Sequence, residues 1–353
     1  MRDNVLLALH EERLAALTAL GYAAGGAPPP LAVLYSALQI APLRRLYSWG
    51  VPNDAALACI ARCAEATGVV EVGAGTGFWA KALSKRGVDV RAYDAAPVDC
   101  ASAHNGHHAL SANTPPPPFT AVLRRDARSA AAAHPRRVLL MCWPPLEDDE
   151  SLPQEARSMA ADALGAYKGA TVCFVGEGAP GVADSAPPHT SPATAGPLFF
   201  SLLARNWTLQ THVPLPRWPT VRFVCVQGLH SWTQYFTKRL GPPAATLVLT
   251  LCHLQAYDSL TVWQRKEALP HALAHEVAEE QLVAWTPPPG AEAARASLLA
   301  KMDAFWADAA AAHILARAAA GGPRASPGLE RAAVDAAICS APLLRRMLLR
   351  LLC

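Results

Sequence analysis

The sequence lacks several features that would place it in common classes of protein. Charged residues make up only 17% of its 353 residues and the formal net charge is +3, so no broad basic surface for a nucleic acid is expected. The longest apolar stretch, residues 244–254, is about half of the ~20 residues that a membrane-spanning helix requires. The first twenty residues carry acids and have no apolar core of a secretory signal. We therefore expect no transmembrane segment and no nucleic-acid partner.

Paired cysteines are also missing. The nine cysteines are scattered without any C-x-x-C pair, and several lie in apolar runs, where a thiol behaves as a small hydrophobe. This pattern favours a reducing, cytoplasmic location. His271, His275 and Glu279 have the i, i+4, i+8 spacing of one helix face, but the pattern is not H-E-x-x-H, and a partly exposed helix face explains it better than a metal site. No metal is expected.

Apolar residues are abundant, at 52%, and their patterns divide the chain into three parts. Residues 1–45 predict an N-terminal helical segment. Residues 46–230 alternate strand-like and helical runs five times, which predicts a mostly parallel sheet covered by helices. Two final runs, Thr208–Val213 and Val221–Val226, follow each other without a helix and would add one antiparallel strand. Residues 231–353 are rich in alanine and leucine and predict a mostly helical C-terminal region.

The strongest local signal is a glycine turn after a short apolar strand. Val69–Val72 leads directly into Gly73, Gly75 and Gly77, and a helix is predicted from about residue 78. Glycines let the backbone turn sharply and approach a ligand, and the first N–H groups of the helix have no partner within it. A strand, a glycine-rich turn and a helix in this order predict a nucleotide site. The alternative is a tight turn without a ligand.

The residues around the turn favour one nucleotide. A dinucleotide fold requires G-x-G-x-x-G, and its third glycine would fall at Phe78. Glu71 precedes the first glycine by two residues, and its charge would repel a pyrophosphate but suits a cation. The α-amino group and sulfonium of S-adenosylmethionine are such cations. An NAD-dependent oxidoreductase is therefore disfavoured.

Two further acids follow predicted strands. Asp94 ends the second strand-like run, about twenty residues after the first glycine, where a carboxylate can accept both ribose hydroxyls. Asp126 follows the expected third strand and could accept a hydrogen bond from the adenine amino group. Each acid also has a simpler structural interpretation. Asp94 would be a turn residue at the end of a strand, and Asp126 would be an acid in a loop.

Together these residues resemble the class I S-adenosylmethionine-dependent methyltransferases. The stretch from Glu71 to Gly77 matches the first motif of that family, Asp94 its ribose-binding acid, Asp126-Ala127 its adenine-side motif, and Cys142-Trp143-Pro144-Pro145 stands at its fourth-strand position. The resemblance covers residues 46–228 and implies a Rossmann-like sheet of seven strands in the order 3-2-1-4-5-7-6, with Val221–Val226 as the antiparallel seventh strand. The cofactor-binding residues it implies are Glu71, Gly73, Ala74, Gly75, Gly77, Asp94, Asp126 and Cys142.

The fourth-strand motif departs from the best-understood members of the family. In relatives that methylate amino groups, an Asn or Asp before two prolines accepts hydrogen bonds from the target amine, and an aromatic residue follows. Here Trp143 replaces the Asn or Asp, and Leu146 replaces the aromatic residue, which disfavours methylation of nucleic acids. The C-W-P-P motif is most similar to that of an uncharacterised group of methyltransferase-like proteins. Trp143 could line a substrate pocket, cap the sulfonium through a cation–π contact, or be a buried aromatic residue.

We expect an S-adenosylmethionine-dependent methyltransferase that acts on an unidentified small molecule or protein. Trp143 and Glu177 are the candidate residues beside the acceptor, whereas the acid run 147–150 reads as a solvated loop. The alternative is a catalytically silent module that keeps the cofactor turn and binds a partner protein through residues 231–353. The altered fourth-strand motif favours the module, and the intact Glu71 and Asp94 favour the enzyme.

Overall fold

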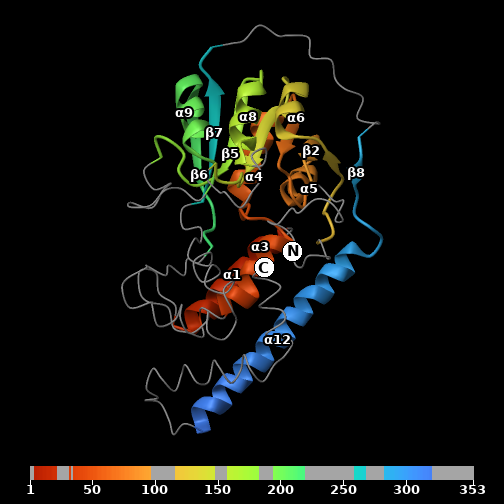
Figure 1. Ribbon diagram of the computed structural model, residues 1–353, viewed down its shortest axis with the longest axis vertical. Coiled ribbons are helices and arrows are strands. Elements are labelled where there is room, and N and C mark those ends of the chain that lie inside the picture. The colour runs from red at the N-terminus through yellow and green to blue at the C-terminus, as the bar shows by residue number, and fades with distance from the viewer. Residues whose placement is uncertain are drawn as a thin grey trace.

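A single eight-stranded sheet occupies the upper half of the view in Figure 1. The computed structural model describes residues 4–21, 32, 35–96, 116–147, 157–182, 194–218, 258–267 and 282–319. The strand order is β6-β7-β5-β4-β1-β2-β3-β8. The strands are β1 (Val69–Val72), β2 (Val90–Asp94), β3 (Val122–Arg124), β4 (Val138–Cys142), β5 (Thr171–Gly176), β6 (Trp207–Pro214), β7 (Ser259–Arg265) and β8 (Ala284–Trp285).

Helices cover both faces of this sheet. One face packs against α6, α8 and α9, and the opposite face packs against α4 and α5, so β1 is buried along its whole length. The helical elements are α1 (Val5–Ala19), η1 (Ser36–Ile40), α3 (Ala41–Leu46), α4 (Asp54–Ala64), α5 (Phe78–Ser84), α6 (Ala127–Ala133), α8 (Met159–Ala166), α9 (Pro197–Asn206) and α12 (Ala291–Ala319).

The directions of the strands confirm the predicted Rossmann-like fold. Strands β1 to β5 run parallel to one another, and β7 is antiparallel to both β5 and β6. Seven strands therefore have the expected order 3-2-1-4-5-7-6. An eighth strand, β8, pairs antiparallel with β3 at the edge of the sheet and was not predicted. Two residues are too few to show a period-2 pattern in the sequence.

The predicted identity of the seventh strand is wrong. Val221–Val226 lies outside the described residues, and the antiparallel strand between β5 and β6 is Ser259–Arg265. A run of β-branched residues predicts a strand but not the strand with which it pairs. Val221–Val226 is the nearer such run after β6, whereas the strand that pairs with β5 and β6 comes later in the chain. Both β7 and β8 come from residues 231–353, which were predicted to be mostly helical. The sheet therefore does not end at the expected boundary, residue 230.

Two local features define the helix that leads into β1. Asn53 caps α4 by accepting a hydrogen bond from the Ala56 N–H at 2.8 Å, and Asp54 lies in the first turn, where a negative charge suits the helix dipole. Gly68, with a φ of 73°, closes the link from α4 to β1. An asparagine before an acid and a glycine after the last turn are the usual sequence signals of helix ends, because each acts within a few residues of its own position.

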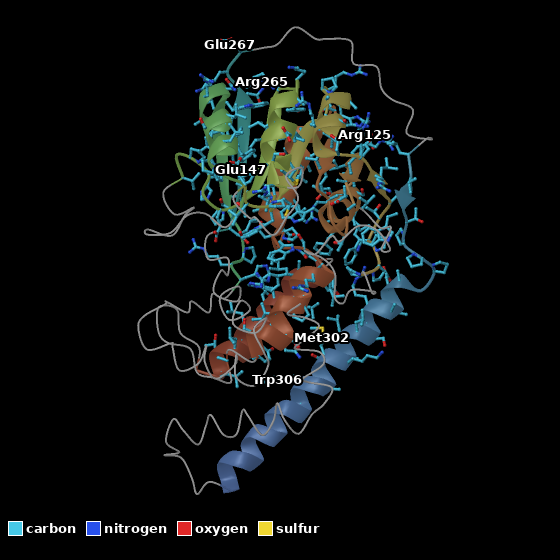
Figure 2. The ribbon with its side chains drawn as sticks, viewed as in Figure 1. Arg125, Glu147, Arg265, Glu267, Met302 and Trp306 are labelled. Carbon is cyan, nitrogen blue, oxygen red and sulfur yellow. The ribbon has the colours of Figure 1, made fainter. Side chains whose placement is uncertain are left out.

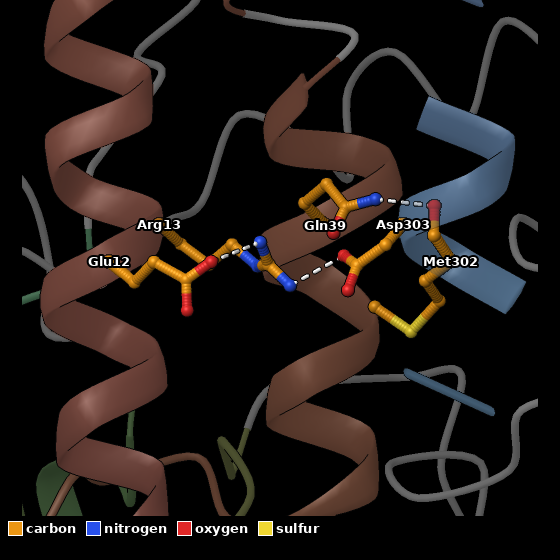
Figure 3. Close-up of polar contacts among 5 residues, drawn as sticks. All are labelled: Glu12, Arg13, Gln39, Met302 and Asp303. Carbon is orange, nitrogen blue, oxygen red and sulfur yellow. Dashed lines mark hydrogen bonds and ion pairs between the residues drawn. The ribbon is translucent and has the colours of Figure 1, made fainter. Parts of the chain in front are cut away.

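The long helix α12 packs beside the N-terminal helices and runs away from the sheet (Figure 1). Arg13 of α1 donates to Asp303 at 2.6 Å, and the side-chain amide of Gln39 donates to the carbonyl of Met302 at 2.7 Å (Figure 3). Both contacts join α12 to segments that are more than 250 residues away in the chain. None of the described helices is long and apolar enough to cross a membrane.

Candidate functional site

The glycine turn follows β1 as predicted, and its backbone requires glycine. Gly73, Gly75 and Gly77 have φ angles of 67°, 54° and 72°, in the left-handed region that other residues rarely adopt. A Cβ atom at Gly73 would lie 2.8 Å from Cε of Met159, at the start of α8. Ala74 is buried, and its N–H donates to the carbonyl of Tyr93 at 2.9 Å. The turn is therefore fixed against the neighbouring strand.

Asp94 lies beside this turn because β1 and β2 are parallel neighbours. One carboxylate oxygen accepts from the Gly75 N–H at 2.9 Å, and the other accepts from the Ala96 N–H at 3.0 Å. The residue is only 9% exposed. Asp94 thus holds the turn in place, which agrees with its interpretation as a turn residue at the end of a strand.

Glu71 is a buried acid of the site with one unpaired oxygen. It is 1% exposed, and its Oε2 atom has no hydrogen-bond partner in the described structure. Burial raises its pKa from 4.5 to about 8, and the nearby Asp94 carboxylate adds to this effect. An unpaired buried carboxylate is costly, and a cation beside it would relieve the cost. The residues present therefore fit a cationic ligand such as S-adenosylmethionine.

Asp126 shares this edge of the sheet with Glu71 and Asp94. The Arg125 N–H donates to the carbonyl of Asp94 at 3.0 Å, which places the end of β3 beside the end of β2. Asp126 is exposed and caps α6 by accepting from the Ser129 N–H at 2.8 Å. Asp126 is thus the N-cap residue of α6, a role that was not predicted from the sequence. A contact with adenine stays a prediction.

The tip of β4 has an unusual conformation. Trp143 is partly buried with a φ of 53°, and its indole N–H donates to Oδ1 of Asp258 at 2.8 Å. Cys142, also partly buried, lies 3.8 Å from the hydroxyl of Ser48. The carbonyl of Pro144 accepts the Ala195 N–H at 2.9 Å. The tip is therefore organised differently from an open Asn-Pro-Pro motif, with the side chain of Trp143 directed to Asp258.

Asp258 also lies at the tip of β4 and was not predicted from the sequence. Strand β7 is antiparallel, so its first residue pairs with the last residue of β5, in the register Gly176 to Ser259. Glu177 and Asp258 consequently emerge side by side, and each is 2% exposed. Oδ2 of Asp258 has no partner among the described residues, and burial with the nearby Glu177 raises its pKa well above 3.8. A correct placement of the seventh strand would have identified Asp258.

A segment before α4 covers the same edge and was also missed. Thr76 donates its hydroxyl proton to the carbonyl of Tyr47, which fixes this segment on the glycine turn. Trp49 stacks on Trp143 with ring centroids 6.0 Å apart, and the guanidinium of Arg44 lies 4.8 Å from the Trp49 ring centroid. Arg44 is 5% exposed, and burial lowers its pKa to about 9. No motif in the sequence signals these contacts.

Among the acids after β4, Glu147 has a structural role. Its carboxylate accepts from the N–H groups of Leu198 and Phe199 at 3.0 and 2.9 Å, at the N-terminus of α9 (Figure 2). The expected solvated loop is therefore wrong for Glu147, and residues 148–150 lie outside the described part. No group of three or more described His, Cys, Asp or Glu side chains could hold a metal. His271, His275 and Glu279 are not described.

Comparison with known proteins finds no matching family model and no matching curated sequence. Among solved structures, magnesium protoporphyrin IX methyltransferase from Synechocystis PCC 6803 with bound S-adenosylmethionine is 9% identical, with a TM-score of 0.31, over 74% of this chain and 97% of that one. The protein MccD is 12% identical, with a TM-score of 0.30, over 60% and 97%. A protein that converts a disulfide bond into a thioacetal group during echinomycin biosynthesis is 15% identical, with a TM-score of 0.30, over 61% and 82%. These likenesses are too distant to carry an argument about activity.

Proposed function

We propose that this chain binds S-adenosylmethionine at the glycine turn and transfers its methyl group to a small-molecule or protein acceptor. The observation that carries the proposal is the carboxylate of Glu71, which is buried beneath the turn with one oxygen unpaired. When bound, the cofactor supplies an activated methyl group on a positively charged sulfur. Such a cation is the kind of ligand that an unpaired buried carboxylate stabilises.

The other residues of the site support this assignment. Asp94, at the end of β2 beside the turn, would accept from the ribose hydroxyls, and the turn from Gly73 to Gly77 would bring the backbone close to the ligand. Asp126 would lie on the adenine side, and Cys142 would border the methyl group from the tip of β4. Methyl transfer to a nucleophilic atom depends mainly on proximity and orientation. Trp143 and Glu177 would provide that orientation.

Ligand-induced thermal stabilisation tests the proposal directly. S-adenosylhomocysteine at ~100 times its dissociation constant is expected to add about 2.7 kcal/mol of stability, and NAD is expected to add none. Gly73→Ala should weaken or abolish the effect, because a side chain is strained at its φ of 67° and would stand in the turn that approaches the ligand. Gly87→Ala is the matched control, since Gly87 has a similar φ of 81° and no atom within 4 Å of the new Cβ.

The outcomes distinguish a methyltransferase from an NAD-binding protein and from a silent binding module. Stabilisation by NAD instead of S-adenosylhomocysteine would refute the proposal. Stabilisation by S-adenosylhomocysteine that is equal in the Gly73 and Gly87 variants would refute the site. Binding that follows the prediction, with no labelled methyl transferred to any acceptor pool, would identify a silent binding module.

A further inference from the structure

Four side chains form a continuous arc at the tips of β4 and β7, here called the strand-tip cluster: Arg44, Trp49, Trp143 and Asp258. Arg44 lies over the ring of Trp49, Trp49 stacks on Trp143, and Trp143 donates to Asp258. The two indoles thus stand between a buried cation and a buried carboxyl group. The cluster is built from α3, the segment after it, and two strand ends.

Both charged ends of the strand-tip cluster have atoms without partners. Nε and Nη1 of Arg44 and Oδ2 of Asp258 are buried and make no hydrogen bond in the described structure. The two residues influence each other electrostatically but form no direct ion pair within it. Native proteins rarely leave such groups unpaired, and exceptions often mark a ligand or catalytic position. Each end therefore retains hydrogen-bonding capacity that the described residues do not use.

The position of the cluster relates it to the methyl donor. Cys142 is the last residue of β4, the strand that neighbours β1, and both Glu71 and Asp258 act on its thiol electrostatically. Its thiol is therefore near both the cofactor-binding acid and the strand-tip cluster. Asp258 also supplies a carboxylate next to residue 143, where relatives that methylate amino groups carry an Asn or Asp. The acceptor side of the site is thus expected at this cluster.

We propose that the strand-tip cluster binds the methyl acceptor, and that this acceptor is a small molecule carrying both an amine and an anionic group. The amine donates to Oδ2 of Asp258, beside the indole of Trp143. The anionic group, a carboxylate or phosphate, accepts from the fork of N–H donors of Arg44. A molecule with both groups satisfies both buried charges at once, which a simple amine or a simple acid cannot do. This inference rests on the proposed function.

The test measures binding to the full-length chain saturated with S-adenosylhomocysteine. The probes are glycine, β-alanine, γ-aminobutyrate and phosphoethanolamine, which carry an amine and an anionic group at different separations, together with ethylamine and propionate, which carry one charge each. At least one of the four two-charge probes should raise the melting temperature at a concentration where ethylamine and propionate have no effect. Calorimetry then gives the dissociation constant.

Two variants connect the binding to the cluster. Asp258→Asn keeps an oxygen for the indole of Trp143, and Arg44→Met keeps an aliphatic stem against Trp49. Each should weaken the two-charge probe by about tenfold or more, because a charge-assisted hydrogen bond is lost. Glu65→Gln and Arg128→Gln remove one exposed acid and one exposed base and should leave binding unchanged. S-adenosylhomocysteine should stabilise all four variants.

Each result has a defined meaning. If no two-charge probe binds, or if ethylamine binds as tightly, the inference is overturned while the proposed function stands. If binding occurs but both cluster variants retain it, the acceptor lies elsewhere. If S-adenosylhomocysteine itself does not stabilise the chain, the proposed function fails first. A variant that loses stabilisation by S-adenosylhomocysteine is replaced by Asp258→Glu or Arg44→Lys, which keep the charges and should retain at least part of the probe binding.

Discussion

Glu71 makes the stability of the ligand-free protein depend on pH. Its pKa is about 8 in the folded state against 4.5 for an ordinary glutamate, because burial disfavours its charge. The folded state therefore holds a proton that the unfolded chain releases. The stability due to this proton is complete below pH 4.5 and is lost as the pH rises towards 8.

Replacement of Glu71 by glutamine should remove this dependence. The wild type is expected to lose up to about 1.4 kcal/mol of unfolding free energy per pH unit between pH 5 and pH 8 relative to Glu71→Gln. Urea denaturation at several pH values measures the difference between the two proteins. Parallel curves would show that Glu71 is already ionised and satisfied.

The same proton should be released when a cation binds. A positively charged ligand beside Glu71 favours the carboxylate, so binding below pH 8 expels up to one proton, and affinity for S-adenosylmethionine should rise by up to about tenfold per pH unit from 6 to 8. S-adenosylhomocysteine lacks the sulfonium charge and should show a weaker rise. Calorimetry in two buffers of different ionisation enthalpy counts the protons. Equal proton release in wild type and Glu71→Gln would exclude this origin.

At the scale of elements, the unit from β1 to β2 was predictable and the end of the sheet was not. The strand, the glycine turn, α5 and Asp94 are specified within one continuous stretch, where period and turn chemistry act locally. Strand β7 follows β6 only after residues 215–258, and its place depends on packing against β5. Asp258 and its contact with Trp143 were missed for that reason. Arg44 belongs to a segment whose position depends on tertiary contacts alone.

The N-terminus of α9 depends on an acid that is distant in the chain. Gly196, the N-cap residue, has no side chain, and Glu147 instead accepts from the first free N–H groups of the helix. Glu147→Ala should reduce the unfolding free energy by about 0.5–2 kcal/mol, and Glu147→Gln should lose less, because it keeps an acceptor but not the charge. Denaturant unfolding measures both variants. Equal stability of all three proteins would contradict the capping role.

At the scale of the whole molecule, residues beyond 230 belong to the same folded unit as the glycine turn. Strand β6 pairs in the sheet only with β7 among the described strands, and Trp263 of β7 is 3% exposed within the main core. Strand β8 and α12 then return the chain to the N-terminal helices, where Met302 packs with Leu6 and Leu17. A division at 230 would therefore cut through one core.

Truncation tests this unity. A chain that ends at residue 230 should fail to unfold cooperatively and should bind the dye ANS, because β5 and β6 lose their shared partner and the core is exposed. A chain that ends at 267 keeps β7 and should still melt cooperatively, at a lower temperature, since β8 and α12 are the described elements that it loses. Circular dichroism melting distinguishes the two. If the shorter chain melted as sharply as the longer one, residues 46–230 would form a domain of their own and β7 would be an accessory strand.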